Sequence, residues 1–425
     1  MGPLPERVGR YALVRELGRG ATATVYLAHD SFAQRDVALK LFAHAPGDKG
    51  LVRGTHRASF LNEAALVGKL HHPHIAALHD VAVEPGFSYV VMEYVPGGTL
   101  VRYASADRLL SLERVVEVAF KLSRALEYAQ QLGVIHRDIK PANVLLMDPF
   151  DVKLSDFGVA KIDSATHTVI ANVGSPAYMA PEQLADLPLD HRGDIYSLGV
   201  MMFQLLTGRL PFDSTSITAL MYQIVNHEAP RLRTLRPGLS EAIEAIVSRA
   251  MQKDPHLRYQ SWFEFGRDLA GLVRGLGRPT ENLSDARKFH ALREFSFFRG
   301  FSQVELWEAL RLATWKGVPQ GTVIIAEGAS CDALYLLLHG RVEVTRAGAR
   351  LATLTPGDLF GEILYFDEIT ERNTTVRSTE DVLVLEIKAA ALNSASEACQ
   401  VQFNKACMRL LVERLSSANR QLARR

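Results

Sequence analysis

The sequence predicts an α+β protein with at least two domains. Its 425 residues exceed what a single hydrophobic core usually supports. Residues 11–42 and 75–95 show β-branched runs broken by Gly and Asp, which is typical of strands and turns, whereas helical periodicity dominates residues 110–274. Short strand-like runs with turn residues between them return after residue 315. A second strand-rich region beyond a long helical one indicates a second folded unit.

Composition and charge exclude several classes of protein. The sequence is 48% hydrophobic and 22% charged, which is ordinary for a globular protein and argues against disorder. Its 48 basic and 47 acidic residues leave a net charge of +1, so we expect neither nucleic acid nor a membrane surface as a partner. The three cysteines, Cys331, Cys399 and Cys407, lack metal-ligand spacing and favour a reducing compartment.

Targeting and membrane signals are weak. The N-terminal residues lack the basic and then apolar run of a secretory signal. The most apolar stretch, Leu198 to Leu206, is only about half the length that a bilayer requires, so a buried helix is the better interpretation. We therefore expect a cytoplasmic protein without an anchor of its own.

A glycine-rich turn follows the first predicted strand. The segment from Leu17 to Val25, LGRGATATV, contains Gly18 and Gly20, with Ala23 at the third position of a GxGxxG pattern. Glycines let a backbone approach phosphate oxygens closely enough for its N–H groups to bind them. Taken alone, such a segment is more often only a turn.

A lysine on a predicted buried strand needs anionic partners. Lys40 ends the apolar run VALK, and burying an unpaired ammonium group is costly. The phosphates of ATP and a carboxylate are suitable partners. Glu63, within the helix predicted over residues 57–70, is the acidic residue placed to supply that carboxylate. Taken alone, a glutamate on a helix is more often solvated.

Three motifs then follow in order: HRDIKPAN at 136–143, DFG at 156–158 and APE at 180–182. Together with the glycine-rich turn and Lys40, they resemble the eukaryotic-like, bacterial-type Ser/Thr protein kinase family over residues 8–274. The resemblance implies a bilobal protein-kinase fold. It also implies transfer of the ATP γ-phosphate to Ser or Thr hydroxyl groups of protein substrates.

The resemblance assigns a role to each matching residue. Asp138 would accept the proton of the substrate hydroxyl, and Lys140 would reach the γ-phosphate. Asn143 and Asp156 would hold Mg²⁺ or Mn²⁺ through oxygen atoms. The remaining positions would bind ATP, with Met92 to Val95 as the adenine-binding hinge; they are Leu17, Gly18, Gly20, Val25, Ala38, Lys40, Glu63, Met92, Glu93 and Val95.

The resemblance also implies structural contacts. Glu182 and Arg258 match a buried ion pair, and Asp194 matches an aspartate that holds the backbone of the catalytic loop. The alternative to an enzyme is a pseudokinase scaffold. Such proteins usually lack the strand lysine, the catalytic aspartate or the metal-binding aspartate, and this sequence has all three.

Hydroxyl side chains lie between the DFG and APE motifs. Phosphorylation of Thr166 or Thr168 would place a phosphate where Arg137 could pair with it and order the loop. The alternative is that these hydroxyl groups are only solvated.

The second strand-rich region resembles the cyclic-nucleotide-binding family of the catabolite-activator type. After a linker predicted at 275–290, residues 291–425 show the short strands of a β-roll with flanking helices. The segments 360–366 and 372–377 match the family's phosphate-binding cassette. Gly361, Glu362, Arg372 and Asn373 would then contact cAMP or cGMP.

Within this cassette, Glu362 would accept from the ribose 2′-hydroxyl and Arg372 would pair with the cyclic phosphate. Leu364 stands where nucleotide-binding members usually have a small residue. The alternative is therefore a ligand-free roll that serves as a docking surface.

The C-terminal end, residues 394–422, is again predicted to be helical. Its apolar side chains fall on one face: Phe403, Cys407, Leu411, Leu415, Ala418 and Leu422. Packing of this face against the roll is the simplest interpretation. A lid over a ligand and a homodimer seam are the alternatives.

Overall fold

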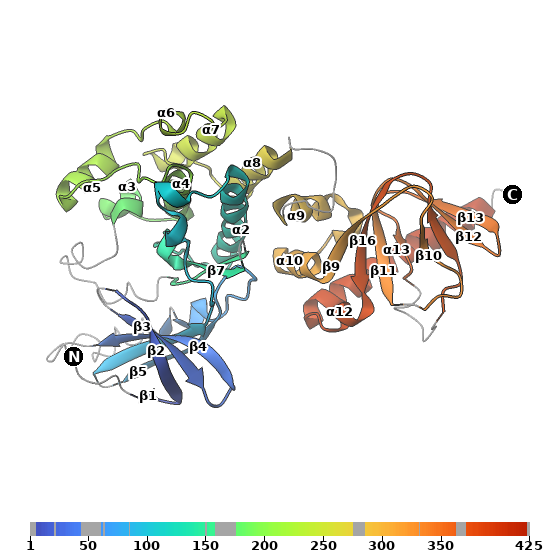
Figure 1. Cartoon of the computed structure of the whole chain (residues 1–425), viewed down its shortest axis with the longest axis horizontal. Helices are drawn as coiled ribbons and strands as arrows, with labels where there is room; N and C mark the ends of the chain where they lie inside the picture. Colours follow the sequence, from blue (N-terminus) through green and yellow to red (C-terminus); the bar gives the residue numbers. More distant parts are fainter. Residues whose placement is uncertain are drawn as a thin grey trace. The chain divides into compact units, whose positions relative to one another are not determined.

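Contacts divide the chain into two compact units, residues 1–273 and 274–425 (Figure 1). Each unit has its own sheets and hydrophobic core. The computed structural model describes residues 6–20, 23–43, 61–62, 64–84, 86–148, 151–157, 176–274, 285–330, 332–362 and 371–422.

The first unit begins with a six-stranded antiparallel sheet. Its strands lie in the order β1 (Arg7–Val8), β2 (Tyr11–Arg19), β3 (Thr24–Asp30), β4 (Arg35–Ala43), β6 (Phe87–Glu93) and β5 (Leu78–Glu84). Apolar side chains that alternate along these strands form a common core, which includes Tyr26, Leu39 and Val91. The central strands β3, β4 and β6 are therefore fixed by neighbouring strands on both sides and by this core.

Helices dominate the rest of this unit. They are α2 (Leu112–Gln131), α3 (Pro181–Leu184), α4 (His191–Thr207), α5 (Ile217–Asn226), α6 (Leu232–Leu235), α7 (Glu241–Ala250) and α8 (Trp262–Arg274). A two-stranded sheet of β7 (Val144–Asp148) and β8 (Asp151–Leu154) follows α2. The apolar run Leu198 to Leu206 lies in α4, which is buried along nearly its whole length. None of the described helices has the length and apolarity needed to cross a bilayer.

A buried ion pair ties α3 to the segment that follows α7. Arg258 donates from Nη1 and Nη2 to the two carboxylate oxygens of Glu182, at 2.6 and 2.7 Å. The Arg258 side chain is 0% exposed and that of Glu182 is 9% exposed. Arg258 also donates to the backbone carbonyls of Arg192, Gln252 and Lys253. The buried guanidinium group therefore has hydrogen-bond acceptors in place of water. This is the pair that the sequence predicted.

The second unit is a β-roll flanked by helices. It opens with α9 (Asp285–Glu294) and α10 (Gln303–Leu312). One four-stranded sheet has the order β10 (Val323–Ile325), β15 (Thr375–Ser378), β12 (Val342–Arg346) and β13 (Ala349–Leu354). The other has the order β14 (Leu359–Phe360), β11 (Ala333–His339), β16 (Val382–Lys388) and β9 (Ala313–Val318). Side chains from both sheets form one core, which confirms the predicted fold class.

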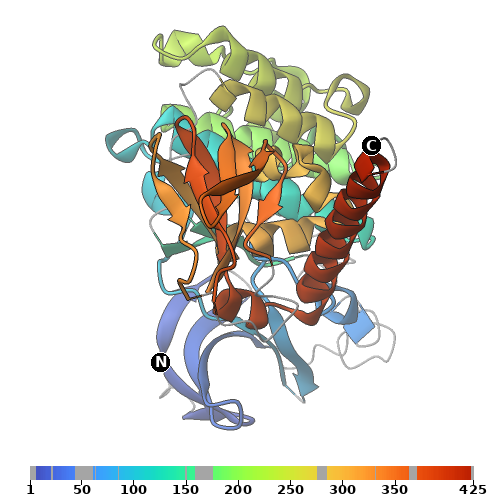
Figure 2. The same ribbon diagram turned by 90° about the vertical axis from the view of Figure 1, so that its right-hand side faces the viewer.

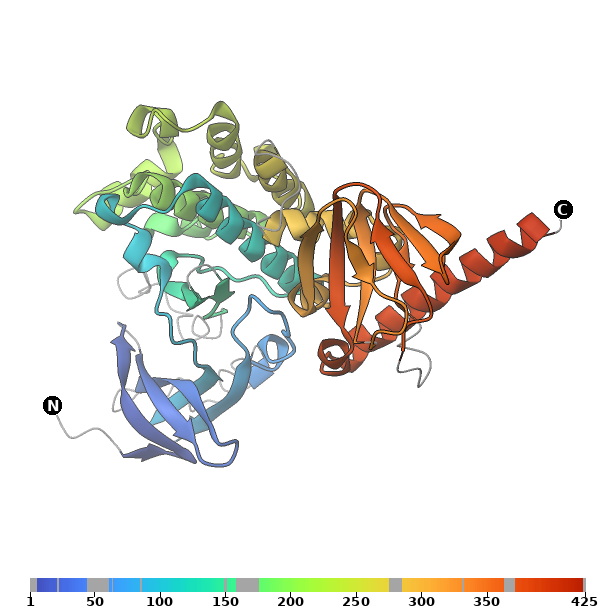
Figure 3. The ribbon, with the colours of Figure 1, turned by 45° about the vertical axis from the view of Figure 1, so that its right-hand side comes forward.

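Two helices end the unit, α12 (Ala389–Asn393) and α13 (Glu397–Leu422). Figures 2 and 3 show α13 alongside the strands of the roll. Phe403 and Cys407 are fully buried, and Phe403 contacts the aromatic rings of the short helix η8 (Ser296–Phe298). Leu411 and Leu415, however, are 37% and 63% exposed. The predicted packing of this face is therefore confirmed for Phe403 and Cys407, whereas Leu415 is largely exposed.

The second half of the segment predicted as a linker, 275–290, is helical and not a linker. Residues 285–290 form the beginning of α9, whose side chains of Ala286, Phe289 and Leu292 are buried. Three apolar residues among many polar ones form a pattern too short to distinguish from a linker. Tertiary packing of those few side chains stabilises the helix.

We expect Arg258→Ala to lower the free energy of unfolding of the first unit by about 3 to 5 kcal/mol, because the substitution leaves a buried carboxylate without its partner. Chemical denaturation of the full chain measures this loss. Arg233→Ala is the matched control, since the Arg233–Glu241 pair has side chains that are 42% and 85% exposed. The control should change stability by less than about 1 kcal/mol. Equal effects of the two variants would contradict the structural role of the buried pair.

Candidate active site and ligand cavity

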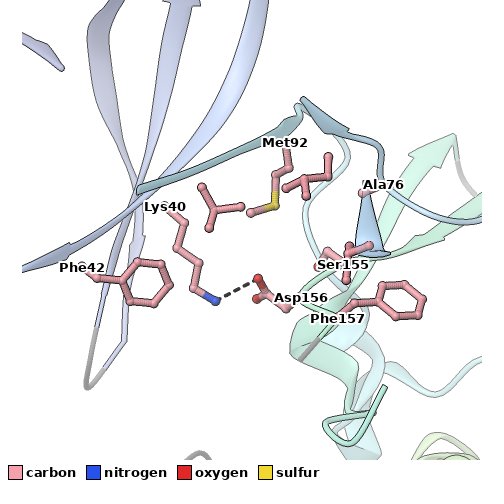
Figure 4. Close-up of a pocket in the computed structure, with 10 residues that line it drawn as sticks. Lys40, Phe42, Ala76, Met92, Ser155, Asp156 and Phe157 are labelled. Atoms are coloured by element: carbon pink, nitrogen blue, oxygen red, sulfur yellow. Dashed lines mark hydrogen bonds and ion pairs between the residues drawn. The ribbon is translucent and has the colours of Figure 1, made fainter. Parts of the chain in front are cut away.

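A cavity lies between the N-terminal sheet and the segment that follows β8 (Figure 4). Most of its lining is apolar, and the polar side chains are those of Lys40, Ser155 and Asp156. The apolar lining consists of Phe42, Val67, Ala76, Leu78, Val90, Met92 and Phe157. The cavity therefore places an apolar wall next to a concentrated pair of charges.

Lys40 and Asp156 form an ion pair across this cavity. Lys40 lies on β4 opposite Val90 of β6, and its Nζ donates to Asp156 Oδ1 at 2.8 Å. Lys40 thus has the anionic partner that its burial requires. Glu63, the partner that the sequence indicated, lies outside the described residues.

The described residues of the glycine-rich segment lie at the end of β2 and the beginning of β3. Gly18 on β2 is in register with Val25 on β3, and the Gly20 N–H donates to the Ala23 carbonyl at 2.8 Å. Leu17 precedes these residues on β2, and Ala38 lies on β4 in register with Met92. The expected nucleotide-contacting residues at the N-terminal end thus come from neighbouring strands of one sheet.

The expected hinge residues end β6 and begin the connection to the helical part. Met92 lines the cavity and Val95 is buried. The side chain of Glu93 has a structural contact that sequence reasoning missed, because it accepts from Lys153 Nζ at 2.8 Å and from the Ala77 N–H at 3.2 Å. Lys153 carries no sequence signal for a partner 60 residues away.

The catalytic-loop residues gather around Asp138. Asp138 Oδ2 accepts from Lys140 Nζ at 2.8 Å and from Asn143 Nδ2 at 2.9 Å. Asn143 Nδ2 also donates to the Asp138 carbonyl at 2.8 Å. Ser155 donates to the Asn143 carbonyl from its backbone N–H at 2.8 Å and from its hydroxyl at 3.1 Å. Because Ser155 precedes Asp156, these bonds join the catalytic loop to the Lys40–Asp156 pair.

A buried carboxylate on α4 holds the catalytic loop from below. Asp194 accepts from the backbone N–H groups of His136 and Arg137, each at 2.8 Å. Arg137 has φ 65°, a left-handed conformation that a bulky residue adopts only under constraint. The two hydrogen bonds supply that constraint, as the sequence predicted for Asp194.

His136 is completely buried beneath the site and connects its two halves. Its Nε2 donates to the Ser155 carbonyl at 2.9 Å, and its Nδ1 accepts from the Asp138 N–H at 3.2 Å. Burial lowers the pKa of His136, although the Asp194 carboxylate opposes this effect. A neutral imidazole fits both hydrogen bonds. Its ring lies 4.6 Å from that of Phe157, measured between centroids.

The oxygen atoms available for a metal ion suit magnesium or manganese. Asn143 donates to Asp138 through its amide nitrogen, so its amide oxygen points away from Asp138. Asp156 adds a carboxylate. The described residues contain no cluster of three or more His, Cys, Asp or Glu that could hold a metal alone. A site with few protein ligands, completed by phosphates and water, is typical of Mg²⁺. Thr166 and Thr168 lie outside the described residues.

A second cavity, of about 420 Å³, lies in the β-roll. Gly361, Glu362, Arg372 and Asn373, which lie in two separate segments of the sequence, all line it. Arg372 is buried and donates to the carbonyls of Gly361 at 3.0 Å and Ala333 at 2.5 Å. Gly361 has φ 77°, and a Cβ there would lie 2.7 Å from the guanidinium of Arg372. A glycine at this position is therefore required for the buried arginine to fit.

One residue of this second cavity was not predicted. Arg414, on α13, lines the cavity and donates from Nη1 to Glu362 Oε1 at 2.6 Å. Its Nη2 also donates to the Leu359 carbonyl. An arginine on a polar helix face gives no sequence signal of this kind.

Two family models match the chain, one in each unit. The family model described as protein kinase domain matches residues 11–263, and the model described as cyclic nucleotide-binding domain matches residues 315–398. A crystal structure of Rad53 in complex with AMP-PNP is similar to this chain at 26% sequence identity and a TM-score of 0.51. That similarity covers 61% of this chain and 64% of the Rad53 chain.

Curated relatives are bacterial Ser/Thr protein kinases. The chain is 35% identical to the serine/threonine-protein kinase PrkC of Bacillus subtilis over 265 residues, which are 61% of this chain and 40% of PrkC. It is 38% identical to the serine/threonine-protein kinase PknJ of Mycobacterium tuberculosis over 273 residues, which are 62% of this chain and 46% of PknJ. The match thus spans less than half the length of each of these relatives.

Proposed function

Because this chain belongs to the protein kinase family, we propose that it is an active Ser/Thr kinase that transfers the γ-phosphate of ATP to protein hydroxyl groups. The observation that supports this activity is the connected pair of clusters: Lys40 with Asp156, and Asp138 with its two donors. The hydrogen bonds of Ser155 join the two clusters. A pseudokinase scaffold does not transfer phosphate and therefore does not require all of these groups together.

The catalytic loop orients the substrate hydroxyl. Lys140 and Asn143 hold the Asp138 carboxylate in one orientation, and from there it accepts the proton of an incoming Ser or Thr hydroxyl. The ammonium group of Lys140 is placed to offset charge on the transferring phosphate. Positioning and charge neutralisation are the main contributions a protein makes to phosphoryl transfer.

The cavity beneath the sheet binds the nucleotide. Lys40 holds the α- and β-phosphates while it stays near Asp156, and the backbone at Met92 to Val95 binds adenine. Asn143 and Asp156 hold the divalent ion through oxygen. Bound Mg²⁺ or Mn²⁺ supplies further neutralisation of the phosphate charge. Thr166 or Thr168 would be the site of autophosphorylation that activates the enzyme.

The β-roll cavity binds cAMP or cGMP and thereby regulates the kinase. Its volume of about 420 Å³ suits a small ligand. Arg372 uses two N–H groups on backbone carbonyls, and a guanidinium has five, so it can be held in place and still pair with a cyclic phosphate. Ligand binding would change activity by favouring one of two domain arrangements.

The exposed side of α13 forms a homodimer seam. Val401, Met408 and Leu415 are exposed and follow each other at seven-residue intervals, and exposed Val412 lies beside them. A stripe of this spacing on one helix is self-complementary to a second copy of the same helix. The enzyme acts in the cytoplasm, where ATP is available and where the free thiols of Cys399 and Cys407 stay reduced.

The kinase activity is tested by Asp138→Asn and Asp156→Ala. Each should lower phosphate transfer from γ-labelled ATP, to the protein itself and to a generic protein substrate, by about a thousandfold. Each variant removes a group that has no substitute in the site. Arg233→Ala is the control and should keep wild-type activity, and mass mapping reports phosphate on Thr166 or Thr168. Absence of Mg²⁺-dependent transfer by the wild type would favour the scaffold.

The nucleotide function is tested by titrating the full chain with cAMP and cGMP. Arg372→Gln should weaken binding by at least about tenfold, because it removes the charge that pairs with the cyclic phosphate. Arg377→Gln is the matched control, since Arg377 is exposed and bonds the Gly321 carbonyl. Kinase assays at saturating nucleotide then measure regulation. No binding by the wild type would favour a ligand-free docking roll.

The homodimer is tested by analytical ultracentrifugation. Met408→Glu together with Leu415→Glu should shift the full chain from the dimer mass toward the monomer mass, since carboxylates on both helices would repel. Glu413→Gln, on the same helix but away from the apolar stripe, should leave the mass unchanged. A wild-type chain that is monomeric at tens of micromolar would rule out the seam.

A further inference from the structure

The connection that leaves β6 is held at both ends by one small sheet, the β7–β8 pair. At its beginning, Glu93 Oε2 accepts from Lys153 Nζ on β8 at 2.8 Å. At its end, the Gly98 carbonyl accepts from the Leu146 N–H on β7 at 2.9 Å. Strands β7 and β8 pair with each other. Residues 93–98, the connecting segment, are therefore fixed at two points to the same short hairpin.

Backbone contact determines the far end of the connecting segment. A Cβ at Gly97 would overlap the Leu146 carbonyl oxygen, so the two backbones pack directly on each other and only glycine fits there. The near end differs, because side chains join Glu93 to Lys153. A substitution can therefore release the near end from the hairpin without disturbing the far end.

The contact between Glu93 and Lys153 is partly buried. The side chain of Lys153 is 11% exposed and that of Glu93 is 28% exposed. The same carboxylate oxygen also accepts from the Ala77 N–H at 3.2 Å, and the Glu93 N–H donates to the Ala77 carbonyl at 2.8 Å. A charge-assisted bond in such surroundings restrains its partners more strongly than an exposed ion pair does.

The strand that carries Lys153 leads to the other end of the nucleotide cavity. β8 ends at Leu154, and Ser155 and Asp156 follow directly. The backbone of Leu154 is fixed as well, since its N–H donates to the His74 carbonyl at 2.8 Å and its carbonyl accepts from the Ala76 N–H at 2.9 Å. Lys153 thus ties the beginning of the connecting segment to the strand that positions Asp156.

The position of the hinge backbone decides how well adenine is bound. The N–H and C=O groups of Met92 to Val95 would bind the base, and such hydrogen bonds form only at donor–acceptor distances of about 2.7 to 3.2 Å. Charges attract the phosphates over longer distances. A small shift of the hinge therefore weakens recognition of the base more than it weakens binding of the phosphates.

We propose that Lys153 is a positioning residue for the adenine end of the nucleotide cavity: by holding Glu93, it fixes the backbone of Met92 to Val95 where the base can bind. This inference rests on the proposed kinase function, which supplies ATP as the ligand. Lys153 is not among the described residues that line the cavity, so it acts through the hinge.

The test uses the full chain as wild type, Lys153→Met, Glu93→Gln and the double variant. Each single substitution should raise KM for ATP and weaken ADP binding, measured by calorimetry, by about tenfold. The double variant should be no weaker than either single one, because both substitutions remove the same contact. The preference for ATP over GTP should fall by about tenfold, whereas kcat at saturating ATP should stay within about threefold of the wild type.

Two further variants serve as controls. Lys153→Arg keeps a cation for Glu93 and should stay within about threefold of the wild type in ADP affinity. Arg249→Met removes an ion pair of similar length, 2.7 Å to Glu264, which joins α7 to α8 with side chains 38% and 27% exposed. Neither partner is among the described residues of the cavity lining, so nucleotide affinity should not change. Chemical denaturation verifies that each variant is folded.

Additive effects of the two substitutions would overturn the role of Lys153. So would wild-type ADP affinity in Lys153→Met, or a loss of kcat as large as the loss of affinity. A wild type that binds ADP but transfers no phosphate would overturn the kinase activity alone, and the ADP titrations would still decide the role of Lys153. A wild type that binds no nucleotide would overturn both. Glu93→Gln provides the same test if Lys153→Met does not fold.

Discussion

The catalytic site depends on one buried carboxylate, that of Asp194. It accepts from two successive backbone N–H groups and so holds Arg137 in a left-handed conformation. A backbone turned in this way leaves the Asp138 side chain partly exposed while His136 is buried in the core. Because α4 is buried along nearly its whole length, Asp194 cannot move without disturbing the helical core.

The other candidate catalytic residues are joined to Asp194 through a chain of hydrogen bonds. Asp138 orders Lys140 and Asn143, Asn143 accepts from Ser155, and Ser155 leads directly to Asp156. The sheet then contributes Lys40 from the opposite wall of the cavity. Charges that would each be costly to bury alone are stabilised by one another, which keeps the site preorganised.

The β-roll achieves a similar arrangement with arginines. Arg372 is buried and donates hydrogen bonds to two backbone carbonyls. A glycine at position 361 leaves room for its guanidinium group. Arg414 arrives from a helix more than 50 positions along the chain and neutralises Glu362. In each unit one carboxylate of the site pairs with a cation from a distant segment, Asp156 with Lys40 and Glu362 with Arg414, so these pairs depend on tertiary structure that no local motif encodes.

The order of the motifs by itself identified the kinase family, and it predicted the catalytic and metal-binding positions and the cassette of the roll, because such chemistry demands particular residue types at close spacing. Helical periodicity likewise located the buried helix α4. Only the tertiary structure decided which charges meet: Lys40 with Asp156, Glu93 with Lys153 and Arg414 with Glu362. It also decided that residues 285–290 are helical and that Leu415 is exposed. The physical reason is that ion-pair partners and covered surfaces are chosen by packing between distant segments, and a sequence pattern records only the near neighbours of each residue.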